Sequence, residues 1–299
     1  MNTLAAWLTI IAYLAFAIPL WRELLSRLSK RLGDWSVGLL LIPFLLASEL
    51  TPTWQEIAHM ALYLALPTLW MRLRKVDARP MDLFHVLVIL SIWVPVEPDL
   101  FLLPDAVELP GVSATLVAGV DLPIGLLTGV LLALYLFTVH HPLKDLSFTF
   151  RLGKKDILEA FNALTAYTII GIPIGLGMRF LVFELDLPLP IGDGILALLA
   201  GYLLTAVPEE ILFRGVIQNL LNRRIDDIRI ALPLSSIIFG LAHLNNTTTR
   251  YPEPNWGYVL MATIAGLAYG YVYHRTKKVT ASAVTHALVN FVWGIVFSG

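Results

Sequence analysis

The sequence lacks cysteine entirely, and charged residues make up only 14% of its 299 positions. Without cysteine the chain can form no disulfide, thiolate-bound zinc site, iron–sulfur cluster or thiol nucleophile, so any metal would have to bind His and carboxylate side chains. Soluble domains carry roughly 25% charged residues, which excludes that class here. The formal net charge of -1 provides no basic surface, and we therefore expect no nucleic-acid partner.

Apolar residues take the place of charge: they make up 57% of the chain and give a mean hydropathy of +0.74. A helix needs about 20 predominantly apolar residues to cross a membrane. This criterion predicts an all-α, polytopic transmembrane helical bundle with about 8–10 membrane helices. The predicted helices are Thr3–Trp21, Trp35–Leu50, Glu56–Met71, Leu83–Val96, Leu122–Val139, Ile157–Phe183, Gly192–Asn219, Ile230–Leu244, Tyr258–Tyr273 and Ala281–Phe297.

Positive charges are segregated between these apolar runs. Nearly all of the 21 Lys and Arg residues lie in five short stretches that fall on one side of the membrane if the spans alternate. Lys and Arg are enriched in cytoplasmic loops. We therefore expect an integral membrane protein, of the plasma membrane, with these stretches in the cytoplasm.

Polar groups that are costly to place in a membrane are concentrated in the second half of the chain. We divide the sequence into an N-terminal transmembrane helical region of unassigned role at 1–139, a cytoplasmic connector at 140–155 and a catalytic core at 156–299. The connector mixes Lys, Arg, Phe and Pro, and we expect its first residues, His140 and His141, to be solvated. No internal period indicates a repeat architecture.

Three polar groups lie in segments apolar enough for a membrane: Glu209 and Glu210 with Arg214, Phe239 with His243, and His286 with Asn290. Ionisable side chains are expensive in hydrocarbon, so each needs a partner, a wet cavity or a chemical role. Members four residues apart point from one face of a helix. The spacing predicts that the three groups converge on a single cavity opening toward the cytoplasm.

Taken alone, each group also has a structural interpretation. Glu210 with Arg214 fits an intrahelical ion pair, and Phe239 fits simple packing. Either histidine fits a hydrogen-bonded core residue, and Asn290 fits a hydrogen bond between helices. Their joint occurrence favours one shared site, but a proton-coupled transporter or channel and a catalytically silent scaffold remain alternatives. Transporters commonly have two related halves with broken helices, and the sequence has no such symmetry.

The blocks that carry these groups resemble a known family. They are PEEILFRG at Pro208–Gly215, FGLAH at Phe239–His243, and the stretch Gly266–Asn290. Their content and order resemble the CPBP intramembrane proteases, which comprise the type II CAAX prenyl endopeptidases and bacterial relatives linked to bacteriocin self-immunity. The resemblance covers roughly residues 200–296 and implies an intramembrane protease core.

The resemblance implies a role for each catalytic candidate. Glu209 and His243 would hold a water molecule, and Glu209 would take its proton as the hydroxide attacks a peptide carbonyl. His286 and Asn290 would stabilise the tetrahedral oxyanion. This chemistry is reasonable on its own terms, because burial makes a carboxylate more basic, and imidazole and carboxamide groups can donate hydrogen bonds to an oxyanion.

The remaining polar residues fit supporting roles. Glu210 and Arg214 can form a buried ion pair that fixes the helix around Glu209. Gly266 and Gly270, four residues apart, would allow their helix to pack closely against a neighbour. The expected substrate is a membrane-associated or lipid-modified polypeptide, and the sequence does not set an oligomeric state.

A zinc mechanism would use nearly the same atoms, because Glu209, His243 and His286 form a His-His-Glu set with room for water. We favour a glutamate-type enzyme without a cofactor, since the sequence contains no HExxH pair and the three donors come from separate helices. Zinc stays open as the alternative.

Overall fold

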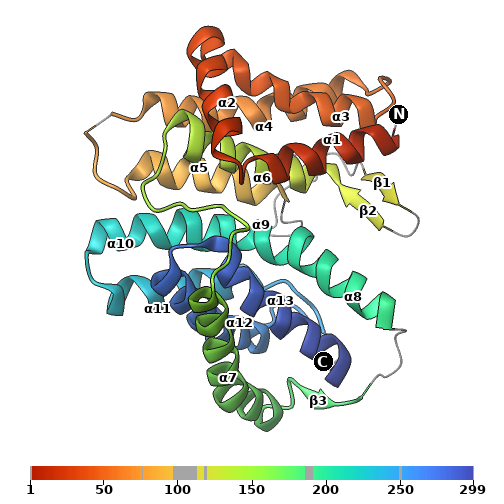
Figure 1. Cartoon of the computed structure of the whole chain (residues 1–299), viewed down its shortest axis with the longest axis vertical. Helices are drawn as coiled ribbons and strands as arrows, with labels where there is room; N and C mark the ends of the chain where they lie inside the picture. The colour runs from red at the N-terminus through yellow and green to blue at the C-terminus, as the bar shows by residue number, and fades with distance from the viewer. Residues whose placement is uncertain are drawn as a thin grey trace. The chain divides into compact units, whose positions relative to one another are not determined.

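The computed structural model is almost entirely helical (Figure 1) and describes residues 2–75, 77–96, 113–117, 120–185, 191–248 and 251–298. It divides into two compact units, Met1–Lys144 and Asp145–Gly299. The division falls inside the segment 140–155. The predicted all-α class is confirmed.

The N-terminal unit consists of helices joined by short connections. Its elements are α1 (Asn2–Ala15), α2 (Pro19–Leu32), the 3-10 helix η1 (Gly33–Leu40), α3 (Leu41–Ala47), α4 (Trp54–Leu73), α5 (Leu83–Trp93), η2 (Val94–Val96), β1 (Ser113–Val117), β2 (Val120–Pro123), α6 (Ile124–Tyr135) and the π-helix η5 (Leu136–His140). Strands β1 and β2 pair antiparallel, with Ser113 opposite Pro123. Thr53 caps α4 in a capping box with Glu56, which explains the sharp start of that helix.

The C-terminal unit is built on longer helices. Its elements are α7 (Lys154–Gly177), β3 (Val182–Phe183), α8 (Ile191–Ala200), the π-helix η6 (Gly201–Ala206), α9 (Val207–Glu210), the π-helix η7 (Ile211–Gln218), α10 (Asn219–Ile225), α11 (Ile228–Leu241), α12 (Trp256–Thr276), α13 (Val279–Val296) and β4 (Phe297–Ser298). Strands β3 and β4 pair antiparallel, so the end of α13 is tied to the chain that follows α7.

Three helices in the described part of the chain are long and apolar enough to cross a membrane: Lys154–Gly177, Gly192–Ile225 and Val279–Val296. Asn2–Ala15 and Pro19–Ala47 make a fourth if they are one span bent by 101°. These helices agree with an integral membrane protein. The number of such helices is below the predicted 8–10, because several apolar runs are divided into shorter helices.

Proline residues and local turns divide apolar runs into separate helices at points that hydropathy does not detect. The predicted helix Thr3–Trp21 is broken, since α1 ends at Ala15 and Pro19 opens α2. Proline has no N–H to donate and suits the first helical position. The predicted helix Leu122–Val139 begins later, because Leu122 belongs to β2 and the helix starts after Pro123.

Two boundaries in the C-terminal unit also differ from the sequence prediction. Helix α7 ends at Gly177, and Phe183, predicted as its last residue, lies in β3. Helix α11 ends at Leu241, so His243 lies in the turn that follows. At its other end α11 is capped by Asp227, and hydrogen bonds from the side chain and backbone of Arg229 lower the pKa of that carboxyl.

The expectation that His140 is solvated is wrong. Its Nε2 lies 3.0 Å from Asp34 Oδ1, and only 14% of its side chain is exposed. Its ring also lies against those of Tyr135 and His141. The π-helix η5 carries His140 back into the N-terminal unit, where the imidazole gains a carboxylate partner.

Pro208 lies in a continuous helical segment, Gly192–Ile225, that is 34 residues long. Proline cannot donate to the carbonyl four residues earlier and its ring crowds that carbonyl. The π-helix η6, directly before α9, widens the helix where this strain falls, and η7 follows α9. Single π-turns are frequent at functional sites, and here they flank Glu209 and Glu210.

Helix α12 approaches both α11 and the π-helix η7 closely at glycines. A Cβ on Gly266 would lie 3.2 Å from Phe239 Cδ1, and one on Gly270 would lie 2.6 Å from Gln218 Oε1. A Cβ on Gly240 would lie 2.5 Å from the carbonyl oxygen of Val259. The close packing predicted for Gly266 and Gly270 therefore holds one wall of the site in place.

We expect Gly240→Ala to destabilise the protein by about 1–3 kcal/mol, because the added methyl group would force the α11 and α12 backbones apart. The measurement is the melting temperature of the purified protein in detergent. Gly177→Ala is the matched control, since nothing lies within 4 Å of its Cβ position. Equal melting temperatures for the two variants would contradict the close helix contact.

Candidate active site

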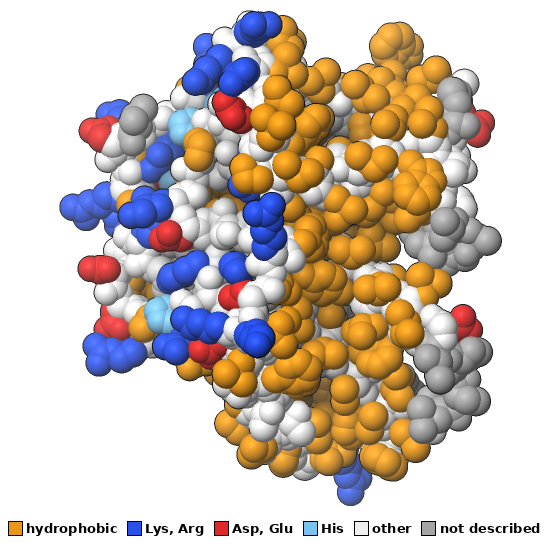
Figure 2. Space-filling view, in the orientation of Figure 1, with side chains coloured by type: hydrophobic (Ala, Val, Ile, Leu, Met, Phe, Trp, Pro, Cys, Tyr) orange, Lys and Arg blue, Asp and Glu red, His pale blue; other side chains and the backbone are white. Residues whose placement is uncertain are grey.

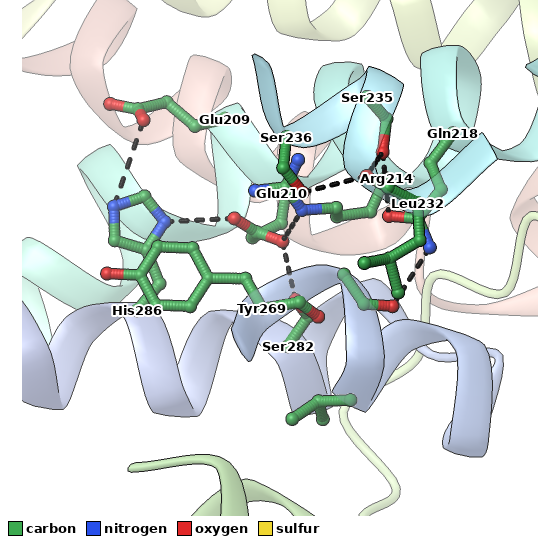
Figure 3. Close-up of polar contacts among 12 residues, drawn as sticks. Glu209, Glu210, Arg214, Gln218, Leu232, Ser235, Ser236, Tyr269, Ser282 and His286 are labelled. Carbon is green, nitrogen blue, oxygen red and sulfur yellow. Dashed lines mark hydrogen bonds and ion pairs between the residues drawn. The ribbon is translucent and has the colours of Figure 1, made fainter. Parts of the chain in front are cut away.

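Three neighbouring segments of the C-terminal unit supply the predicted polar groups, and Figure 3 shows Glu209, Glu210, Arg214 and His286 among them. The segment from α9 into η7 supplies Glu209, Glu210 and Arg214, α11 and its following turn supply Phe239 and His243, and α13 supplies His286. Side chains far apart in sequence thus meet in one cluster. The geometry agrees with the convergence expected from the spacing of the three groups.

Glu210 is the most heavily engaged carboxylate of the cluster, and its side chain is fully buried. Its Oε2 lies 3.1 Å from Arg214 Nε and 2.5 Å from the Ser282 hydroxyl, while its Oε1 lies 3.0 Å from His286 Nδ1. The Ser282 hydroxyl is also 2.7 Å from the Tyr269 carbonyl. With both oxygens occupied by its neighbours, Glu210 is placed to hold other groups in position.

Arg214 is buried completely beside Glu210. Its guanidinium carbon lies 4.7 Å from the centroid of the Phe239 ring and 5.9 Å from that of Tyr269. Neither Nη1 nor Nη2 has a hydrogen-bond partner among the described residues. The charge is therefore compensated by one carboxylate and two aromatic faces, which is sufficient only while Glu210 stays ionised.

His286 lies between the two glutamates (Figure 3). Its Nδ1 is 3.0 Å from Glu210 Oε1, and its Nε2 is 3.8 Å from Glu209 Oε2. The ring stacks on Tyr269 with centroids 4.4 Å apart and planes 13° apart. Because an ionised Glu210 accepts the Nδ1 hydrogen, Nε2 faces Glu209 and carries a hydrogen of its own only when the imidazole is protonated.

Glu209 differs from its neighbour in exposure and in partners. Its side chain is 31% exposed, against 0% for Glu210. Its Oε2 is buried and has no hydrogen-bond partner in the part of the chain that the structure describes. Glu209 thus presents a free acceptor oxygen next to His286, and part of its side chain is accessible from outside the cluster.

His243 joins the cluster from the turn after α11. Its Nδ1 lies 2.9 Å from the Phe239 carbonyl oxygen, which can only accept, so Nδ1 carries the hydrogen and Nε2 is left as an acceptor. The ring stacks on Tyr258 at 5.1 Å. Glu209 and His286 both lie close enough to His243 to interact electrostatically with its imidazole.

Phe239 does more than fill space. Its ring lies 4.7 Å from the His243 ring and 5.7 Å from the His286 ring, measured between centroids. It also contacts Arg214 and Tyr269. The phenyl ring sets the separation of the two imidazoles and shields the Glu210–Arg214 pair.

Asn290 is the site candidate that lies apart from this cluster. It follows His286 by four residues on α13, but it is exposed. It lines a cavity of about 300 Å³ together with Gly201, Thr205, Ala287 and Phe291. Asn290 therefore lies at the rim of that cavity, four residues after His286 along α13.

Sequence reasoning missed Tyr269, Ser282 and Tyr258. Ser282 precedes His286 by four residues, so extending the His286–Asn290 spacing backward would have found it. The tyrosines offered no such signal, because a Tyr between apolar neighbours is most simply interpreted as packing or as a membrane-interface residue.

The donor atoms of the cluster do not match the geometry of a metal site. No group of three or more His, Cys, Asp or Glu side chains in the described ranges has a geometry that could hold an ion. His286 Nδ1 is engaged by Glu210, and its Nε2 is directed at Glu209. The residues of the cluster, as they lie, do not form a ready zinc site.

Fold and site together define a helical integral membrane protein with a carboxylate and imidazole centre inside apolar helices. A model of the family described as "Type II CAAX prenyl endopeptidase Rce1-like" matches residues 191–292. The match confirms the resemblance to the CPBP intramembrane proteases over the segment that carries all of the site candidates. No curated protein and no solved structure matched the chain.

Proposed function

We propose that the C-terminal unit is an intramembrane endopeptidase that hydrolyses peptide bonds of membrane-associated or lipid-modified polypeptides. The observation that carries this proposal is the placement of His286 between a buried, fully engaged Glu210 and a partly exposed Glu209 with a free acceptor oxygen. Two carboxylates in such different environments are suited to two different tasks.

Glu209 and His243 are suited to activate water. A water molecule can donate one hydrogen to the free Oε2 of Glu209 and the other to Nε2 of His243. As the water oxygen attacks the peptide carbonyl carbon, Glu209 takes a proton, and the same proton passes to the leaving nitrogen when the C–N bond breaks. Carboxylates that are shielded from bulk water act well as general bases of this kind.

His286 is suited to stabilise the oxyanion that forms in this step. The Glu210 carboxylate accepts the Nδ1 hydrogen and fixes the orientation of the ring, so that Nε2 faces the site and donates to an oxyanion when the imidazole carries both hydrogens. Asn290 can provide a second donor from the rim. Removing one oxyanion donor typically costs about 10²- to 10³-fold in rate.

The surroundings of the site favour a substrate that is already in the membrane. The family that matches is named for prenyl endopeptidases, which act on lipid-modified chains. The cavity beside Asn290 is lined mainly by apolar and small residues. Membrane proteins of cells that express the intact chain can be compared by proteomics with those of cells that express Glu209→Gln. Substrates should accumulate in the variant, and identical profiles would reject the proposal.

We expect hydrolysis to continue in protein that contains no stoichiometric metal, because Glu209 alone can act as the base. The measurement combines elemental analysis of the purified protein with peptide hydrolysis before and after chelation. Loss of activity on chelation with recovery by zinc would reject this prediction and favour a metalloprotease. The same protein with zinc added in excess controls for inhibition by the metal.

A further inference from the structure

A groove runs through the N-terminal unit between the η1–α3 segment and α4. Its volume is about 940 Å³, at the upper end of the range for ligand sites. Most of its lining is apolar, with Val37, Leu41, Ala61, Leu66 and Leu69 among the lining residues. Gly38 also lines the groove. A Cβ added there would meet nothing within 4 Å, so the groove is open beside Gly38.

One end of the groove is charged. Asp34 and Arg72 line it, and Arg72 Nη1 lies 3.0 Å from Asp34 Oδ2. The other oxygen of Asp34 is 3.0 Å from His140 Nε2. The Asp34 carboxylate is thus shared by two partners, while the Arg72 side chain stays 71% exposed and keeps donors directed outward.

The last turn of α2 adds positive charge next to this end. Lys30 and Arg31 are exposed there, directly before Gly33 and Asp34 of the groove. Figure 2 shows Lys and Arg side chains gathered over α2, with hydrophobic side chains over α1 and α3. The charged end therefore carries net positive charge, and the groove continues from it as an apolar channel.

Trp35 makes this end suited to a membrane surface. The residue is 89% exposed while it lines the groove beside Asp34. Exposed Trp is enriched at the level of lipid headgroups, and Lys and Arg beside it attract anionic lipids. An apolar channel that begins at a basic mouth suits a ligand with an anionic headgroup and an apolar chain.

We propose that this groove binds one anionic phospholipid, with its phosphate at Arg72 and the Lys30–Arg31 turn and one acyl chain along the channel past Gly38. The charge of the mouth selects the headgroup, and the length of apolar lining selects the chain. The site belongs to the N-terminal unit and does not depend on the catalytic roles proposed above.

The test uses the intact protein, purified in detergent and mixed with phosphatidylglycerol or with phosphatidylcholine. Native mass spectrometry then counts the lipids retained per chain. We expect one retained phosphatidylglycerol and weaker retention of phosphatidylcholine. Arg72→Gln should lower the affinity for phosphatidylglycerol about fivefold, the change that one lost charge near a lipid surface produces. It should lower the affinity for phosphatidylcholine less, because the choline cation already offsets the phosphate charge of that lipid. Arg223→Gln, an exposed arginine outside the groove, is the charge control.

Gly38→Phe tests the channel independently of charge, because the ring would occupy the space of the acyl chain. It should abolish retention of both lipids, whereas Gly177→Phe, at another open glycine, should not. Melting temperatures of the variants exclude misfolding as the cause. Equal retention by Gly38→Phe and its control, or no headgroup preference, would overturn the proposal. A stable dimer that Gly38→Phe dissociates would assign the groove to a second copy of the chain instead.

Discussion

Replacing Glu209 by Gln is expected to lower the rate of peptide hydrolysis by about 10²- to 10⁴-fold, the range that general bases contribute. The carboxamide keeps the shape of the side chain but cannot take a proton from water. Glu209 is partly exposed, its Oε2 has no hydrogen-bond partner among the described residues, and His286 Nε2 lies 3.8 Å away, so the fold depends little on the Glu209 charge. The loss should therefore appear in kcat, with KM and melting temperature nearly unchanged.

The assay is hydrolysis of a membrane-anchored peptide by the protein in liposomes, with kcat and KM measured separately. Glu184→Gln is the matched control, since Glu184 is an exposed glutamate of the same unit. If both variants cleave at the rate of the intact protein, Glu209 is not the base. A drop in melting temperature of Glu209→Gln alone would instead assign it a structural role.

Replacing Arg214 by Met is expected to destabilise the protein by about 3–5 kcal/mol, because it leaves the Glu210 carboxylate buried without its cation. Both side chains of the pair are 0% exposed, so solvent cannot compensate for the loss. The methionine occupies most of the volume of the arginine and keeps contact with Phe239. The midpoint of unfolding by sodium dodecyl sulfate, followed by circular dichroism, measures the change.

The double variant Glu210→Gln with Arg214→Met separates stability from activity. Removing both charges should recover most of the lost stability, since a buried pair replaced as a whole is often neutral. Hydrolysis should remain slow, because His286 loses the carboxylate that holds its Nδ1 hydrogen. A double variant as unstable as Arg214→Met would mean that the pair does not act as a unit.

The sequence was sufficient to predict the cluster because its three polar blocks lie in apolar helices with a spacing of four residues. Glu210 forms the expected ion pair with Arg214, and His286 lies next to both glutamates. Ser282 and Tyr269 were not predicted, because their contacts depend on how α12 and α13 pack. Such contacts between helices have no counterpart in local periodicity.

Asn290 and His243 mark the limits of the spacing rule. Residues four apart on a helix differ by about 40° around its axis, so His286 can face the interior while Asn290 reaches the exposed rim. His243 was predicted inside a helix, yet α11 ends two residues earlier. It still turns back to Phe239 because its Nδ1 bonds the Phe239 carbonyl, much as the next helical turn would.

Helix boundaries were harder to predict than helix existence. Hydropathy averages over a window, so the break before Pro19 and the strand that includes Leu122 were absorbed into apolar runs. The π-helical turns on either side of α9 left no compositional trace. The turn before α9 follows from the geometry that Pro208 imposes on the preceding backbone, which does not extend to the turn after α9.

The free oxygen of Glu209 has a consequence for inhibitor chemistry. In the proposed mechanism a water molecule donates to this oxygen, and a ligand hydroxyl that replaces the water keeps the hydrogen bond. Small diols and hydrated ketones, whose paired hydroxyls resemble the tetrahedral adduct, should therefore bind at Glu209 in place of that water. Fragment screening could therefore begin with such compounds, and scaffolds that reach the rim at Asn290 could be grown from there.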